Sequence, residues 1–185
     1  MSNAYYKPPR FWKKGKNYLM KKDKKLASLI KSYPNDFLFT KSDPFLTLAR
    51  SIVGQQISVK AAQSVWDRLV IKIKKVTPLN VKKLHSNSLK SVGLSRQKVH
   101  YLKNLADAFI EHKIKIKLWS KMNDEEIIQD LIQIKGIGRW TAEMFLIFNL
   151  CRPDIFPVDD LGLIKGICNC YNINYPITKE RAIKM

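Results

Sequence analysis

The sequence predicts an all-α fold. Apolar residues recur every three or four positions through most of the 185-residue chain, which is the spacing that gives a helix one buried face. Residues that commonly cap helices stand at the starts of several of these stretches. The run at 70–76 alternates like a strand, but it has no second strand with which to pair, so we interpret it as a helix end. There is no internal repeat and no long linker.

The N-terminal half is predicted to hold a basic arm and a series of helices. Residues 1–36 carry many lysines and end in a helical pattern. A cap and a proline at residues 42–44 open a helix that ends near Gly54. A polar turn follows and ends at Ser58, which caps the next helix. The apolar residues of that helix recur at helical spacing and are Ala61, Ala62, Val65, Trp66 and Leu69.

Further helices are predicted in the C-terminal half. Residues 87–92 form a short helix that ends at Gly93, and Ser95 opens a longer one. Residues 123–126 place a cap and three acids at a helix start, where the helix dipole favours negative charge. The helix at 139–148 is apolar on nearly every side, which predicts that it is buried.

We interpret the chain as one domain, 1–185, with four parts. These are a basic arm and first helix (1–36), a helical lobe (37–122), a segment with a hairpin and two aspartates (123–165) and a C-terminal part (166–185). An apolar fraction of 45% can support a hydrophobic core, which excludes a disordered chain.

The charge of the chain predicts a polyanionic partner. Lysine and arginine number 34 against 15 acids, which gives a net charge of +19. Nucleic acid is the first expectation and an anionic membrane surface the second. Three cysteines without a CxxC pair indicate reduced thiols rather than a metal or disulfide framework. There is no secretory signal and no apolar run long enough to span a bilayer, so we expect a cytoplasmic protein without membrane association.

A Gly-x-Gly turn between two helices is the first candidate site. Residues 131–142 comprise a helix, a tight turn with Gly136 and Gly138, and a second helix. Glycine adopts positive φ and places no Cβ between the backbone and a ligand. The amides of the turn and the positive end of the second helix then suit a phosphate, with Lys135 and Arg139 beside them. An ordinary helix–helix connection is the alternative interpretation.

Two adjacent aspartates are the second candidate. They follow Phe148 by about a dozen residues, which is enough chain to retrace the preceding helix and return to the hairpin turn. We expect Asp159 to cap the helix at 161–168 and Asp160 to face a cleft. A carboxylate near a phosphate site is unfavourable unless a cation forms there during function. Capping alone is the alternative interpretation.

The polar turn Gly54–Ser58 is the third candidate. It lies between two helices that are predicted to be buried. It is either a plain connection or a loop whose side chains enter a DNA groove and fill the gap left by a displaced base.

Together these segments resemble the helix-hairpin-helix (HhH-GPD) DNA glycosylases, and among them the 3-methyladenine DNA glycosylase II branch. The matching stretches occur in the family's order at residues 43–62, 92–106, 134–145 and 153–163. The resemblance implies a two-lobed helical bundle with the active-site cleft between the lobes. It also implies an enzyme of base-excision repair that flips a damaged nucleotide out of the duplex and hydrolyses its N-glycosidic bond.

The resemblance assigns roles to individual residues. Asp160 takes the catalytic position, where it would stabilise an oxocarbenium-like sugar and help position the attacking water. Trp140 stands where bifunctional relatives carry a nucleophilic lysine, which implies a monofunctional enzyme without lyase activity. Trp140, Met144 and Leu161 would line the pocket for an alkylated purine. Among them Trp140 offers an aromatic face, which attracts a cationic base. Packing in the core is the alternative for Trp140.

The resemblance also implies contacts with double-stranded damaged DNA. Gln56 takes the position of a wedge that plugs the vacated duplex, with Ile57 beside it. The residues expected to contact the DNA backbone are those of the hairpin: Lys135, Gly136, Ile137, Gly138, Arg139 and Thr141. A structural sodium or potassium ion at the main chain of Gly136 and Gly138 is implied, and no other cofactor. We expect a monomer.

The sequence departs from the family at several points. Met144 and Leu161 stand where some members carry aromatic residues, which implies a pocket less suited to bulky or neutral lesions. The C-terminal part, which ends at Met185, is shorter than in relatives of the family, so we expect the sequence to be a shortened or truncated form of such a protein. Neither a β-sheet lobe nor a four-cysteine iron–sulfur loop is present. The alternative function is a non-catalytic helix-hairpin-helix DNA-binding module, which would need the glycines and the basic residues but no acid beside the DNA.

Overall fold

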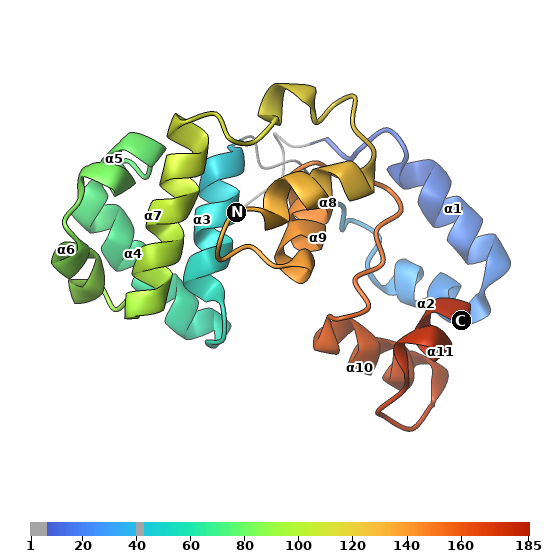
Figure 1. The fold of residues 1–185 in the computed structure, drawn as a ribbon. Coiled ribbons are helices and arrows are strands. Elements are labelled where there is room, and N and C mark those ends of the chain that lie inside the picture. Colours follow the sequence, from blue (N-terminus) through green and yellow to red (C-terminus); the bar gives the residue numbers. More distant parts are fainter. Residues whose placement is uncertain (1–6, 40–42) are drawn as a thin grey trace. The chain divides into compact units, whose positions relative to one another are not determined.

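The computed structural model describes residues 7–39 and 43–185. These residues form eleven α-helices, one short 3-10 helix and no strand, which confirms the all-α fold (Figure 1). The predicted cap at Ser42 and the first six residues of the predicted basic arm lie outside the described ranges. The helices are α1 Trp12–Lys22, α2 Lys24–Ser32, α3 Pro44–Gly54, α4 Val59–Ile73, α5 Pro78–Lys83, α6 Ser86–Ser91, α7 Arg96–Ile110, η1 Ile116–Leu118, α8 Asp124–Ile132, α9 Arg139–Phe148, α10 Leu161–Tyr171 and α11 Lys179–Lys184.

The described residues fall into two compact units. The terminal unit comprises residues 7–39 and 146–185, and the central unit comprises residues 43–145. The sequence interpretation separated the hairpin from the preceding helices at residue 122, whereas the structure places both in the central unit. One direct link within this unit runs from the turn after α3 to the hairpin: Gln55 Nε2 donates a hydrogen bond to the carbonyl oxygen of Gly136 at 2.9 Å.

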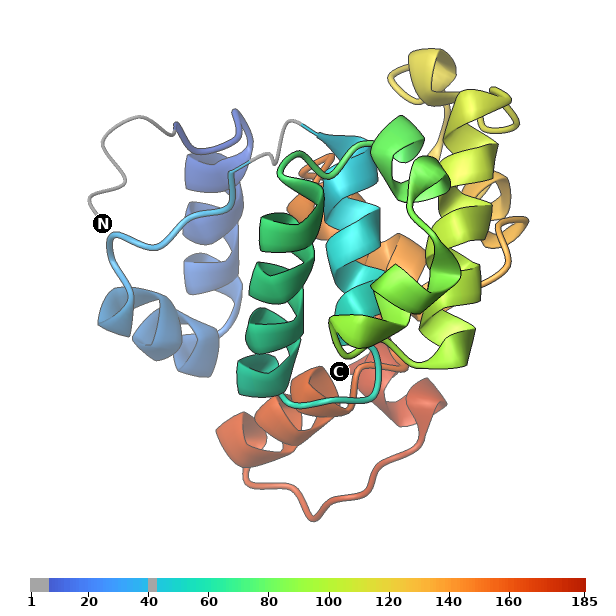
Figure 2. The same cartoon turned by 90° about the vertical axis from the view of Figure 1, so that its left-hand side faces the viewer.

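The core of the central unit is built around α3 and α7. Asp43 caps α3 by accepting a hydrogen bond from the amide of Leu46 at 3.0 Å, and Pro44 occupies the first turn, where proline needs no amide partner. The helix packs against α4 and α7, and α5 and α6 pack against α7 (Figure 2). The fully buried side chains of these helices are mainly aliphatic and include Leu48, Ile52, Leu69, Leu89, Leu102 and Leu105.

Helix α8 begins with the cap that the sequence predicted. Asn123 accepts a hydrogen bond from the amide of Glu126 at 2.9 Å, and the Glu126 carboxylate accepts one from the amide of Asn123 at 2.7 Å. This reciprocal capping box satisfies amides that a helix start leaves without partners. On the other side of α8, the buried carboxylate of Asp130 accepts a hydrogen bond from the Trp119 indole at 2.7 Å, and the Trp119 ring stacks edge-to-face on Phe145.

The terminal unit has a smaller core. Ile164 and Cys168 of α10 are buried together with Ala182 of α11. The single helical pattern seen in the basic arm is two helices, because Asp23 interrupts it and caps α2 through the amide of Leu26 at 2.8 Å. The phenol of Tyr171 donates a hydrogen bond to the other oxygen of Asp23 at 3.0 Å and so ties α10 to the start of α2.

No helix in the described ranges has both the length and the apolar character needed to cross a membrane. The three cysteines are free thiols.

Candidate functional site

The hairpin turn between α8 and α9 depends on one of its two glycines for its conformation. Gly136 has φ +110°, and a Cβ at this position would lie 2.4 Å from Cγ of Tyr101. Both facts exclude a larger residue. Gly138 is different, because its φ is ordinary for any residue and a Cβ there would meet no atom within 4 Å. The predicted need for positive φ therefore holds for Gly136 alone, while Gly138 presents an open backbone that a ligand can approach.

Three main-chain groups of the turn form hydrogen bonds within the protein. The amide of Ile137 donates to the carbonyl of Ile134 at 2.9 Å and closes the turn. The carbonyl of Gly138 accepts from the amide of Ala142 at 3.0 Å, and that of Gly136 accepts from Gln55. A sodium or potassium ion at the main chain of the two glycines stays a prediction. Among the described residues, no group of three or more His, Cys, Asp or Glu side chains is placed to hold a metal ion.

The two charged residues beside the turn have different surroundings. Lys135 is exposed, as a contact to a phosphate requires. Arg139 instead donates from both terminal nitrogens to the Glu125 carboxylate, at 3.0 and 2.7 Å, and from Nε to Glu143 at 3.1 Å. The hydrogen bond from Arg139 lowers the pKa of Glu125 from 4.5 to about 2. Arg139 thus ties α9 to the start of α8, and the DNA contact expected of it stays a prediction.

The turn between α3 and α4 carries the predicted wedge residues. Gln56 is exposed and has φ +56°, a left-handed conformation that is uncommon outside glycine. Ile57 beside it is 39% exposed, although exposed isoleucine is unfavourable in water. The side chain of Gln55 turns the other way and contacts the hairpin. Sequence analysis did not single out Gln55, and no local signal pointed to a partner 81 residues away.

The wedge turn and the hairpin face one depression of the central unit. It has a volume of about 390 Å³. Gln55, Gln56, Tyr101, Gly136 and Gly138 are among the residues that line it. The structure therefore brings together two of the three predicted sites, the wedge turn and the hairpin, around a depression lined by polar groups.

The predicted base-binding residues of α9 share one side of the helix. Trp140 and Met144 are four residues apart, a spacing that aligns side chains on a helix. Trp140 is 41% exposed, which is more than core packing would leave, and Met144 is half-buried. Thr141 is only 4% exposed, so its burial does not suit the DNA contact predicted for it. Leu161, at the first position of α10 in the terminal unit, is 65% exposed.

The helix cap expected of Asp159 is formed by Asp160 instead. Asp160, not Asp159, caps α10: its Oδ1 accepts a hydrogen bond from the amide of Leu163 at 2.8 Å. The residue directly before the first helical residue is the one whose side chain reaches these amides, which explains the difference. Asp159 pairs with Lys179 of α11. The cap holds the Asp160 carboxylate in a fixed position, and the absence of a side chain at Gly162 leaves it room, since a Cβ there would lie 3.1 Å from Asp160 Oδ1.

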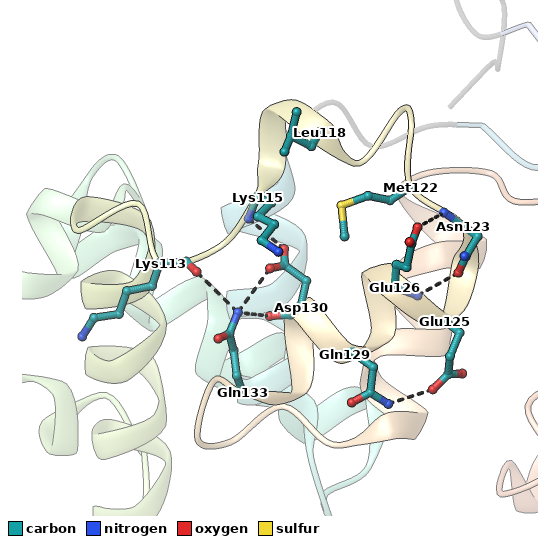
Figure 3. Close-up of a pocket in the computed structure, with 10 residues that line it drawn as sticks. All are labelled: Lys113, Lys115, Leu118, Met122, Asn123, Glu125, Glu126, Gln129, Asp130 and Gln133. Atoms are coloured by element: carbon teal, nitrogen blue, oxygen red, sulfur yellow. Dashed lines mark hydrogen bonds between the residues drawn. The ribbon is translucent and has the colours of Figure 1, made fainter.

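A second cavity beside α8, of about 610 Å³, does not form a catalytic constellation. Figure 3 shows that its polar side chains bind one another and the backbone. The Gln133 amide donates to the carboxylate and the carbonyl of Asp130, at 3.2 and 2.8 Å. The amide of Gln129 donates to Glu125 at 2.8 Å, and Asn123 forms the capping box. These groups stabilise α8 and its connections.

Comparison with known proteins identifies the family. Residues 49–184, which include the hairpin and both aspartates, match the family described as HhH-GPD superfamily base excision DNA repair protein. The chain belongs to this superfamily. It is 35% identical over 169 residues to DNA-3-methyladenine glycosylase 1 of Schizosaccharomyces pombe, an alignment that covers 87% of this chain and 72% of that protein. It is also 35% identical over 183 residues to DNA-3-methyladenine glycosylase of Saccharomyces cerevisiae, with 88% and 61% covered.

A solved structure extends the similarity to three dimensions. The 3-methyladenine DNA glycosylase Mag1 of Schizosaccharomyces pombe, in complex with abasic DNA, superposes with a TM-score of 0.83 at 31% identity. The match covers 92% of this chain and 86% of that one. The helical fold described above is therefore that of this superfamily.

Proposed function

We propose that the protein is a monofunctional DNA glycosylase that flips alkylated purines of the 3-methyladenine type out of duplex DNA and excises them by hydrolysis. One observation carries the proposal: the similarity to two yeast proteins that are named DNA-3-methyladenine glycosylases extends over 87% and 88% of the chain. The family match, from residue 49 to residue 184, includes the wedge turn, the hairpin and Asp160. The reaction would begin base-excision repair and leave an abasic site.

In this proposal the central unit binds the damaged duplex. The open backbone at Gly138 accepts a phosphate of the lesion strand, with Lys135 supplying positive charge. Gln56 enters the base stack and fills the space of the flipped nucleotide. Trp140 receives the flipped base against its exposed ring, which attracts the positive charge of an alkylated purine.

Asp160 acts on the sugar of the flipped nucleotide. The bond between C1′ and the purine nitrogen breaks, and its electron pair neutralises the cationic base as the base leaves. The oxocarbenium-like sugar that remains is stabilised by the negative carboxylate, because opposite charges attract at short distance. Water then adds to C1′ and releases a proton, which Asp160 accepts and passes to solvent. The hydrogen bond from Leu163 keeps the carboxylate oriented throughout.

The side chain at position 140 supports the proposed absence of lyase activity. A bifunctional glycosylase attacks C1′ with an amine and forms a Schiff base. An indole cannot form that bond, so Trp140 supports release of the base with the DNA strand left intact.

Product analysis tests the proposal. We expect the purified protein to release free methylpurine from methylated duplex DNA, and we expect the strand to break only after alkaline treatment. Borohydride should trap no covalent complex between the protein and DNA. A trapped complex or strand breakage without alkali would show that the enzyme is bifunctional, and DNA binding without base release would favour a non-catalytic module.

A further inference from the structure

A hydrogen bond within the central unit joins the wedge turn to the hairpin. The Nε2 atom of Gln55 donates to the carbonyl oxygen of Gly136 at 2.9 Å, and the two residues are 81 positions apart in the sequence. Gln55 directly precedes Gln56, whose left-handed backbone directs the chain away from α3. One residue of the turn thus contacts the hairpin while the next is exposed to solvent.

The hairpin is also fixed from its other side. The Tyr101 side chain packs against the α-carbon of Gly136 so closely that a Cβ there would lie 2.4 Å from the ring. The Gln97 amide and the Tyr101 hydroxyl are in turn hydrogen-bonded at 2.6 Å. Gly136 is therefore contacted both by Gln55, in the turn after α3, and by Tyr101 of α7 in the same unit.

We propose that Gln55 is a positioning residue that holds the wedge Gln56 at a set distance from the backbone anchor of the hairpin. Base flipping requires the two contacts together, because the strand must be held while the wedge replaces the extruded base. If the wedge turn were mobile, part of the free energy of DNA binding would be spent on ordering it. The hydrogen bond to Gly136 keeps the turn ordered before DNA binds. The inference rests on the proposed function, since it assigns Gln55 a part in the same reaction.

Two matched variants separate this role from a general effect on folding. Gln55→Leu keeps the size of the side chain and removes the donor. Gln63→Leu is the control, because Gln63 is an exposed glutamine of the same unit whose hydrogen-bond partners, Asp67 and Arg50, are not in the hairpin. Thermal unfolding of both variants reports whether the fold is retained.

The first readout is binding to two duplexes, one undamaged and one with tetrahydrofuran, a stable abasic-site analogue that leaves a gap for the wedge. We expect Gln55→Leu to lose about tenfold in preference for the analogue, a factor typical of one lost hydrogen bond, and to bind undamaged DNA within about twofold of the wild type. Gln63→Leu should match the wild type. Equal losses on both duplexes, or no difference between the two variants, would overturn the inference, as would a wild type without preference for the analogue.

The second readout is a double-mutant cycle with Gln56→Ala. If Gln55 acts through Gln56, the double variant should lose no more preference for the analogue than the worse single variant. Additive losses would mean that Gln55 acts on something other than the wedge and would contradict the inference. A wild type that releases no base would count against glycosylase activity only, because the binding preference decides the role of Gln55 without catalysis.

Should Gln55→Leu fail to fold, Gln55→Glu decides the question with nearly unchanged shape. A carboxylate cannot donate to the Gly136 carbonyl, whereas a carboxylic acid can. We expect the variant to lose the analogue preference at neutral pH and to recover it, relative to wild type at the same pH, as the introduced carboxyl group becomes protonated. A variant equal to wild type at neutral pH would overturn the inference.

Discussion

At the scale of single residues, Asp160 combines a structural task with its proposed chemical one, and the two can be separated. Asparagine caps a helix about as well as aspartate does, but it carries no charge. We therefore expect Asp160→Asn to keep nearly the wild-type free energy of unfolding, whereas Asp160→Ala should lose about 0.5–2 kcal/mol with the cap to Leu163. Urea denaturation measures both. Equal losses in the two variants would mean that the charge, not the cap, stabilises α10.

The two glycines of the hairpin should respond differently to alanine. We expect Gly136→Ala to lose about 1–3 kcal/mol of stability, because the new methyl group would overlap Tyr101 and the φ of +110° is strained for alanine. Gly138→Ala should fold normally and bind DNA more weakly, because its methyl group would stand where a phosphate approaches. Thermal unfolding and duplex binding of the two variants check this. Normal DNA binding by Gly138→Ala would exclude a phosphate contact at this position.

At the scale of the elements, the ion pair between α8 and α9 predicts a pH dependence of stability. Its arginine hydrogen bond lowers the pKa of Glu125 to about 2 in the folded state, against 4.5 for an unperturbed glutamate. The unfolded chain therefore binds the proton first as pH falls, and the contribution of Glu125 is present above pH 4.5 and lost toward pH 2. We expect the urea midpoints of wild type and Glu125→Gln to differ at pH 6 and to converge as the pH is lowered. A difference that is independent of pH would contradict this.

Elements whose signals are local could be predicted from the sequence. The starts of α3, α4, α7 and α8 were found because a capping side chain stands directly before each helix, and the hairpin was found because its glycines lie together. Of the three helices of six residues, which are too short to show a period, α5 and α11 were not predicted, whereas α6 was found because Gly93 marks its end. The two helices of the arm were seen as one pattern because both sides of Asp23 are rich in lysine.

The candidate site could be predicted only as far as its separate segments. The contacts that join them link distant positions: Gln55 to Gly136, and Arg139 to Glu125. Such pairs depend on how helices pack and leave no trace in local spacing. The pairing of Arg139 with Glu125 was missed for the same reason, whereas Glu143 stands four residues after Arg139 on the same helix and could have been noticed from local spacing.

At the scale of the whole molecule, the net charge of +19 predicts DNA binding that weakens steeply with salt. Lys135 is exposed beside the hairpin. We therefore expect Lys135→Ala to lose the same factor of affinity for damaged and for undamaged duplex. The slope of log K against log salt should become about 1 less steep. Lys113→Ala is the control, because Lys113 is paired with Glu111 at 2.6 Å. Titrations by fluorescence anisotropy at several salt concentrations measure the slopes. An unchanged slope in Lys135→Ala would exclude a phosphate contact there.

The central claim is that Asp160 is the catalytic residue of a DNA glycosylase, and the release of methylpurine from methylated duplex DNA tests it most directly. Wild type, Asp160→Asn and Asp159→Asn should be compared at saturating enzyme. We predict that the wild type releases methylpurine and that Asp160→Asn releases it about 100-fold or more slowly while it still binds DNA. Asp159→Asn should release methylpurine at nearly the wild-type rate, because Asp159 pairs with Lys179. Release by Asp160→Asn at the wild-type rate would contradict the account.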